Sequence, residues 1–395
     1  MSAPRVLYHH RIRADDGQAV HVREMIAALR ASGCAVDECA LVRKGRGDAD
    51  ASAAGAGGGF WHKLSLPRTA VEALEILYNR RGRVMLRAAA AQQRPDFVYE
   101  RHALHCRAGL DAARALGVPL LLEVNSPMTV EMAKLGKLRF PARARATERL
   151  VLAGADAVLA VTQTLADMLV ELGARRERVR VIGNGADPAR YGGDAVAAAA
   201  SARARWGLPA DAFALGFVGY MRDWHRLDLV LDAMAKPELA TLALVLMGEG
   251  PALAPLLASA SARGLAERVR ALGVVPPELL PMHVLACDGA LIPAINAYAS
   301  PLKLFDSLAA GVPTVAPDQP NLRETLVHGD TGLLFRPGDA DDLARQLARL
   351  VGDRAGARAL GARGRAALHA QQWTWQGNAG RVLEVFAGLR RGGLA

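Results

Sequence analysis

The stretch SPLKLFDSLAAGVP, residues 300–313, predicts a complete short helix that leads into a strand. Ser300 is a favourable N-cap, and Pro301 suits the first helical position because the N–H that proline lacks would be unpaired there. Leu302 begins a stripe of apolar side chains at three- to four-residue spacing, and Gly311 suits a left-handed C-cap. Such a helix packs its apolar stripe on a sheet and leaves its first turn near any ligand at the sheet edge.

Two charged residues near the start of this helix indicate what that ligand is. Lys303 lies beside backbone N–H groups that have no partner within the helix, a position that favours an anion such as phosphate. Asp306 shares a face with Lys303, and its carboxylate can accept two hydrogen bonds from a ribose diol. A solvated salt bridge between the two is the alternative interpretation. The pair favours a nucleotide diphosphate, provided that other segments of the chain also indicate a ligand site.

The N-terminal residues predict the first unit of an α/β domain. A strand over residues 5–12, a helix over 19–32 and a strand over 36–42 follow one another. The first loop holds the single glycine Gly17 and lacks the G-x-G-x-x-G pattern, which counts against NAD or FAD. Because loops after parallel strands line the ligand crevice, we expect Gly17 and His21 near the site.

Polar side chains end two later strands of this half. Glu100 and Arg101 close the strand over 96–101, and Glu123 and Asn125 close the one that begins at Leu120. These residues are candidates for the crevice, and ordinary loop polarity is the alternative.

A second α/β pattern begins after the Ala-rich helix over 195–205. Strands over 213–218 and 242–247 are each followed by glycine-containing loops, which allow a ligand to approach the backbone closely. The chain therefore predicts two α/β domains in 395 residues.

Composition narrows the function only coarsely. The formal charge of +10 favours anionic partners, namely nucleic acid, an acidic membrane or phosphorylated substrates. Basic residues among apolar ones over 132–150 predict a membrane or polyanion surface, or a solvated helix face. The run over 45–59 is of low complexity and predicts a mobile loop. No apolar run is long enough to span a membrane, no signal peptide is expected, and the four cysteines are expected to be reduced thiols in a cytoplasmic protein.

Several segments together resemble the retaining family-four members of the GT-B glycosyltransferases. Gly17 and His21 are similar to the first glycine loop and helix of that family, and residues 184–187 match its N-G-x-D. Residues 217–219, 248–251 and 300–313 are similar to its donor-binding loops and helix. The resemblance implies an α/β GT-B fold, with two Rossmann-like domains that face a central cleft.

The resemblance also implies an organisation. Residues 1–188 would form the acceptor-binding domain, 189–372 the nucleotide-sugar-binding domain, and 373–395 a helix that crosses back to the first. The partners would be a nucleotide-diphosphate sugar and a glycan or lipid-linked acceptor, with an acidic membrane as a peripheral contact and no nucleic acid. No cofactor and no metal are expected, because basic residues and helix dipoles would neutralise the phosphates.

The implied site residues fall into three groups. The catalytic pair would be His21 and Glu123, and the acceptor side would hold Glu100, Arg101, Asn125 and Asn184. The donor would contact Gly17, Gly219, Arg222, His225, Gly248, Glu249, Tyr298, Ser300, Pro301, Leu302, Lys303 and Asp306.

Four positions depart from the pattern of the family. Tyr298 and Asp306 stand where two glutamates are usual, His225 stands where a lysine is usual, and Glu123 stands where a histidine is usual. The predicted function is transfer of a sugar to a glycan, lipid-linked or small-molecule acceptor. The alternatives are a non-catalytic nucleotide-sugar-binding protein, and an epimerase whose acid and base carboxylates would be Glu100, Glu123 or Asp288.

Overall fold

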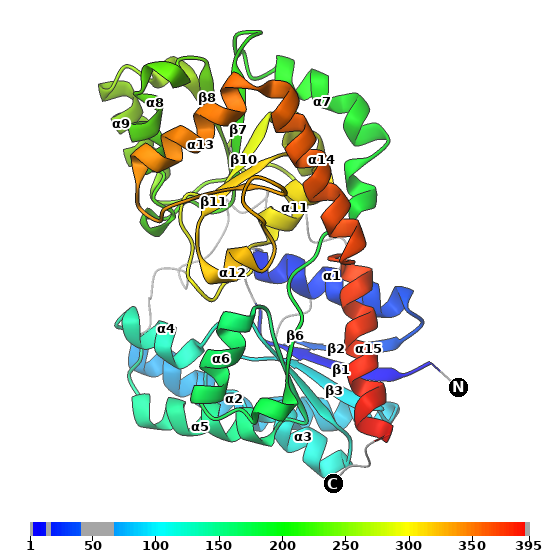
Figure 1. Ribbon diagram of the computed structural model, residues 1–395. Coiled ribbons are helices and arrows are strands. Elements are labelled where there is room, and N and C mark those ends of the chain that lie inside the picture. The colour runs from blue at the N-terminus through cyan, green and yellow to red at the C-terminus, as the bar shows by residue number, and fades with distance from the viewer. Residues whose placement is uncertain (1–2, 13–16, 41–66, 392–395) are drawn as a thin grey trace, which may run out of the picture. The chain divides into compact units, whose positions relative to one another are not determined.

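The computed structural model describes residues 3–12, 17–40 and 67–391, so the low-complexity run over 45–59 lies outside the described residues (Figure 1). The chain divides into two compact units, one made of residues 1–182 and 379–395 and the other of residues 183–378. Each unit is an α/β domain with helices on both faces of a parallel sheet (Figure 1).

The sheet of the first unit has six parallel strands in the order β2-β1-β3-β4-β5-β6. They are β1 (Arg5–His10), β2 (Ala35–Ala40), β3 (Phe97–Arg101), β4 (Leu120–Val124), β5 (Ala157–Ala160) and β6 (Val179–Val181). The helices are α1 (Gly17–Ala31), α2 (Arg68–Gln92), α3 (Ala108–Leu116), α4 (Met128–Lys134), α5 (Pro141–Gly154), α6 (Gln163–Glu171) and the end of α15 (Trp375–Arg391). All residues of β3, β4 and β5 are buried, as expected for parallel strands that helices cover on both faces.

The sheet of the second unit is also six-stranded and parallel, in the order β9-β8-β7-β10-β11-β12. The strands are β7 (Phe213–Val218), β8 (Leu242–Met247), β9 (Val269–Ala271), β10 (Gly289–Leu291), β11 (Thr314–Pro317) and β12 (Leu333–Phe335). The helices are α7 (Asp194–Ala204), α8 (Asp228–Met234), α9 (Leu253–Ala262), α10 (Leu280–Leu285), α11 (Leu302–Ala310), α12 (Pro320–Arg323), α13 (Ala340–Gly352) and α14 (Arg354–Ala370).

The strand orders locate the binding edges. The direction in which strands are added reverses between β1 and β3 in the first unit, and between β7 and β10 in the second. Ligands of open parallel sheets bind outside the carboxyl ends of the strands at such a reversal. The loops that follow these strands are therefore the places to search for a site.

Two predictions of local helical structure differ from the structure. The basic stretch over 132–150 is not one helix, because α4 ends at Lys134 and α5 begins at Pro141, a residue that suits the first turn of a helix and not its interior. Ser300 is not an N-cap, since α11 begins one residue later than predicted, after Pro301. Among the described residues, no helix combines the length and the apolar character needed to cross a bilayer, and the four cysteines are buried with no disulfide between them.

Candidate functional site

A pocket in the second unit lies at the reversal between β7 and β10. It is lined by Val218 at the end of β7, by Ile292 after β10, and by Lys303 and Asp306 of α11. The two charged residues that the sequence placed on one helix face thus line one pocket at the edge of the sheet where ligands bind.

Lys303 is the main cation of this pocket. It lies in the first turn of α11, whose N-terminus receives no side-chain cap, and its Nζ lies 3.9 Å from the centroid of the Phe217 ring. Across residues 3–12, 17–40 and 67–391, no carboxylate forms an ion pair with Lys303. Burial lowers the pKa of Lys303 to about 7, because the ammonium has lost much of its water. An anion that enters the pocket would therefore find a cation without a carboxylate partner.

Glycine is required in the loops beside Lys303. Gly219 follows β7 with a φ of 136°, and a Cβ atom there would lie 3.3 Å from the Lys303 Nζ. Gly248 follows β8 with a φ of 133°, and its Cβ would collide with the Gly219 carbonyl. The two loops pack backbone against backbone, and the Glu249 carbonyl accepts a hydrogen bond from the Met221 N–H at 2.7 Å. Only glycine allows the two loops to pack this closely beside Lys303.

His225 does not supply the positive charge that a lysine would. Its Nδ1 accepts a hydrogen bond from the Arg222 N–H at 3.2 Å, and its ring packs on Phe217. Burial, followed by the charges of Lys303 and Arg222, lowers the pKa of His225 to about 3. His225 is therefore neutral at pH 7, and Arg222, which is exposed, and Lys303 carry the positive charge of this region.

Asp306 is held by a residue that the sequence did not indicate. The Tyr191 hydroxyl donates to the Asp306 Oδ1 at 2.6 Å. Tyr191 is buried in the turn that follows the N-G-A-D segment, and no local pattern predicts its contact with α11. The hydrogen bond fixes one carboxylate oxygen, so Asp306 meets a diol in one orientation.

Asn184 and Ser300 meet in the second unit. The Asn184 N–H donates to the Ser300 Oγ at 3.2 Å, and the Asn184 side chain donates to the Ser300 carbonyl at 2.5 Å. Ser300 therefore joins α11 to the N-G-A-D turn and does not cap the helix. The sequence predicts Asn184 on the acceptor side of the first domain, but the structure places it in the second unit, next to the start of α11. Tyr298 lies in the loop before α11, where its hydroxyl accepts from the Asn296 amide at 3.1 Å.

In the first unit, Glu123 is the centre of a buried polar network at the end of β4. Its carboxylate accepts from the Tyr99 hydroxyl at 2.6 Å and from the Asn125 amide at 2.5 Å, and it pairs with the Arg101 guanidinium. The His21 Nε2 of α1 lies 3.0 Å from the same carboxylate. The structure thus brings His21, Arg101, Glu123 and Asn125 together in one network at the carboxyl ends of β3 and β4.

The state of Glu123 follows from these partners. Burial alone would raise the pKa of Glu123, but the charges of His21 and Arg101, with the hydrogen bonds from His21 and Tyr99, hold the pKa well below its usual range. Glu123 is ionised at any working pH, which makes it a weak proton acceptor. The geometry suits Glu123 to orienting His21 and Arg101. Gly17 lies at the exposed start of α1 in this same unit.

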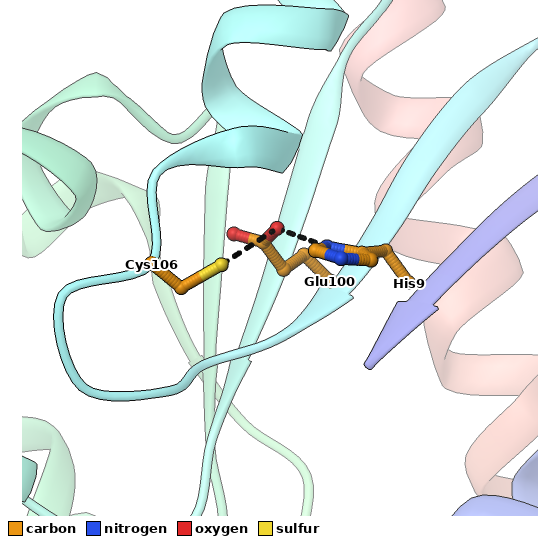
Figure 2. Close-up of side chains that lie close together, drawn as sticks. All are labelled: His9, Glu100 and Cys106. Atoms are coloured by element: carbon orange, nitrogen blue, oxygen red, sulfur yellow. Dashed lines mark hydrogen bonds and ion pairs between the residues drawn. The ribbon is translucent and has the colours of Figure 1, made fainter. Parts of the chain in front are cut away.

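Glu100 lies in a different cluster, which is fully buried. Figure 2 shows its carboxylate between the His9 ring and the Cys106 thiol, and ligand atoms of the three residues that could hold a metal ion lie within 4.8 Å of one another. The Glu100 Oε2 accepts from His9 at 2.5 Å and from the Gly109 N–H of α3 at 2.8 Å. Burial and the Glu100 charge raise the pKa of the Cys106 thiol, which favours the thiol over the metal-binding thiolate. The cluster is best explained as a buried cap for the N-terminus of α3, so Glu100 faces no open crevice.

Both units of the chain match families of known proteins. The family described as Glycosyltransferase Family 4 matches residues 16–190, and the one described as Glycosyl transferases group 1 matches residues 199–367. The chain is 32% identical over 325 residues to a D-inositol 3-phosphate glycosyltransferase of Thermomonospora curvata, which covers 78% of this chain and 75% of that protein. A protein of the same name from Nocardia farcinica is 32% identical over 74% of this chain and 66% of its own length.

Solved structures show the same fold at lower identity. The sucrose-phosphate synthase of Thermosynechococcus elongatus superposes with a TM-score of 0.76 at 21% identity, over 99% of this chain and 100% of that one. Anabaena HepE in complex with UDP-glucose gives a TM-score of 0.72 at 18% identity, over 98% and 100% of the two chains. These likenesses confirm the predicted fold class.

Proposed function

The chain belongs to the family 4, group 1 glycosyltransferases of GT-B fold, and we propose that it transfers a sugar, with retention of anomeric configuration, from a nucleotide-diphosphate sugar to an acceptor hydroxyl. The second unit would bind the donor and the first unit the acceptor. Because its relatives are named for D-inositol 3-phosphate, a small phosphorylated polyol is the first acceptor to test.

The observation that carries this proposal is the pocket at α11. Lys303, without a carboxylate partner in the described residues, would bind the diphosphate together with the uncapped N–H groups of the helix. Asp306, oriented by Tyr191, would accept the ribose hydroxyls. Phosphate and ribose recognition side by side is what a nucleotide sugar requires.

Charge stabilisation would come from the protein itself. As the bond between sugar and phosphate breaks, negative charge grows on the diphosphate, and Lys303 and Arg222 would stabilise it without a metal ion. The acceptor would attack from the face that the diphosphate leaves, and a phosphate oxygen would take its proton. Glu123 would orient His21 and Arg101 and would not itself take the proton, because its pKa is low.

The contacts of the candidate carboxylates do not favour an epimerase. Glu100 caps α3, Glu123 is ionised within its network, and Asp288 accepts from Arg203 and from the Ala214 N–H, each at 2.8 Å. An epimerase needs a carboxyl group that can give up or take a proton near neutral pH, and none of the three is placed for it.

The test begins with binding. UDP, GDP and ADP and their sugar conjugates are compared by thermal unfolding, where a ligand at about one hundred times its dissociation constant adds about 2.7 kcal/mol to the folded state. The nucleotide that stabilises the protein is then used as a sugar donor with D-inositol 3-phosphate, in buffer with and without EDTA. An α-linked product from an α-linked donor, formed equally in EDTA, is expected. A product of inverted configuration, or stabilisation by no nucleotide, would contradict the proposal.

A further inference from the structure

We propose that residues 134–145, which comprise the last residue of α4, the turn after it and the start of α5, dock this protein on an anionic lipid bilayer. The turn reads KLGKLRFPARAR and belongs to the first unit. It lies outside the donor pocket and the Glu123 network, so this inference goes beyond the proposed function. We call it the α4–α5 turn (Figure 1).

Large apolar side chains of the α4–α5 turn lie in solvent. The Leu135 side chain is 53% exposed and Phe140 is 38% exposed, and Val130 on the preceding helix is 43% exposed. Single exposed apolar residues are normal on a protein surface, but three of them on adjoining segments suggest a contact. Each would gain by leaving water.

Cations surround these apolar side chains. The exposed basic residues of the turn are Lys134, Lys137, Arg139, Arg143 and Arg145. No acidic residue occurs between residues 132 and 147, and none of the five cations forms an ion pair within the part of the chain that the structure describes. The turn therefore presents exposed cations that form no ion pair with a carboxylate in the described residues.

Two buried carboxylates hold the turn in place. Glu72 of α2 accepts from the N–H groups of Arg139 and Phe140 at 2.6 and 2.9 Å, and is itself held by His105 at 2.8 Å. At the other end, Glu148 of α5 accepts hydrogen bonds from the Thr129 hydroxyl and backbone of α4. Because these hydrogen bonds fix the backbone of the turn, its exposed side chains can bind a partner without a large loss of conformational entropy of the chain.

The alternation of apolar and basic side chains favours an anionic bilayer over a nucleic acid as the partner. At a bilayer surface, Leu and Phe enter the boundary between head groups and acyl chains while Lys and Arg stay among anionic head groups. A nucleic acid would use the cations but would leave Leu135 and Val130 in water, and the turn offers a single aromatic ring for stacking. Charge and apolar exposure together therefore fit an anionic bilayer better than a polyanion.

The experiment measures sedimentation of the full-length protein with vesicles. Vesicles of phosphatidylcholine alone are compared with vesicles in which about a third of the lipid is phosphatidylglycerol. Two variants test the two kinds of contact: Lys134→Gln/Lys137→Gln and Leu135→Ser/Phe140→Ser. The matched control is Val196→Ser/Arg358→Gln, which removes one exposed apolar and one exposed basic residue from the second unit.

We expect binding to the anionic vesicles that weakens with salt, and little to phosphatidylcholine. Each lysine removed should weaken binding about fivefold, and the apolar double variant should weaken it at least tenfold, with the control unchanged. Equal binding to both vesicle types, retention by a DNA or heparin column with no vesicle binding, or equal loss in the control would overturn the proposal. All variants should keep the nucleotide-induced thermal shift, so failure here is separate from failure of the donor site.

Discussion

The pH dependence of donor binding is the sharpest test of the site. Burial lowers the pKa of Lys303 to about 7 in the free protein, so near neutral pH its ammonium loses its proton as the pH rises. A diphosphate binds the charged form, and binding therefore raises the pKa of Lys303. At pH 6 about nine-tenths of the molecules carry the proton and at pH 8 about one-tenth do, so the dissociation constant should rise about tenfold between them.

The measurement is titration calorimetry with a nucleotide sugar, because its two phosphates do not titrate in this range. At pH 8 the protein should take up about 0.9 proton for each donor bound, seen as a dependence of the apparent enthalpy on the ionisation enthalpy of the buffer. Lys303→Met should remove both the proton uptake and the pH dependence. At pH 6 it should also cost about 1.5–3 kcal/mol, or about 10- to 150-fold in affinity, and about tenfold less than that at pH 8.

A matched variant separates this effect from a general change in charge. Lys236→Met removes a lysine of the same unit that pairs with Asp341 at 2.7 Å, and it should leave the pH dependence intact. The same dissociation constant at pH 6 and pH 8 in the wild type would refute the reasoning. So would a pH dependence that survives in Lys303→Met.

Three further predictions concern the residues around the two sites. Glu123→Gln should destabilise the protein at pH 7 by about 3–5 kcal/mol in urea unfolding, because it leaves Arg101 buried without a carboxylate. The pKa of Glu123 is lower in the folded protein than in the unfolded chain, so the ionised carboxylate stabilises the fold above the unfolded pKa. Wild-type stability should therefore fall as the pH drops below about 4, toward the folded pKa. Tyr191→Phe should raise the donor dissociation constant about three- to tenfold in the same calorimetry, through loss of the hydrogen bond to Asp306, and an unchanged constant would contradict that role. Gly250→Ala should lower the urea midpoint, because φ is 146° there and a Cβ would meet the backbone of the preceding loop; an unchanged midpoint would show that the loop can move.

The central strands of the second sheet could be predicted from the sequence because they are unbroken apolar runs. Residues 213–218 and 242–247 were predicted with the bounds that β7 and β8 have, since buried parallel strands hold few polar residues. Lys303 and Asp306 were also placed on one face by helical spacing alone. Local patterns suffice where the structure depends on neighbours along the chain.

The contacts that could not be predicted from the sequence join residues that are far apart in the chain. Ser300 has the composition of an N-cap, but its hydroxyl accepts a hydrogen bond from Asn184, which lies 116 residues away. The hydrogen bond from Tyr191 to Asp306 spans 115 residues, and the low pKa of Glu123 depends on groups from other elements. Only the break of the basic stretch before α5 could have been found locally, from Pro141.

The arrangement of charge is more informative than its sum. A formal charge of +10 fits nucleic acid, membrane and phosphate equally, and it says nothing of which cations are available. Arg101 is buried against Glu123, and Arg203 pairs with Asp288, so these cations hold the fold together. Lys303 and the cations of the α4–α5 turn have no carboxylate partner in the described residues. Under the two proposals, a diphosphate at α11 would offset the desolvation of the Lys303 ammonium, and an anionic surface would offset the repulsion among the exposed cations of the turn.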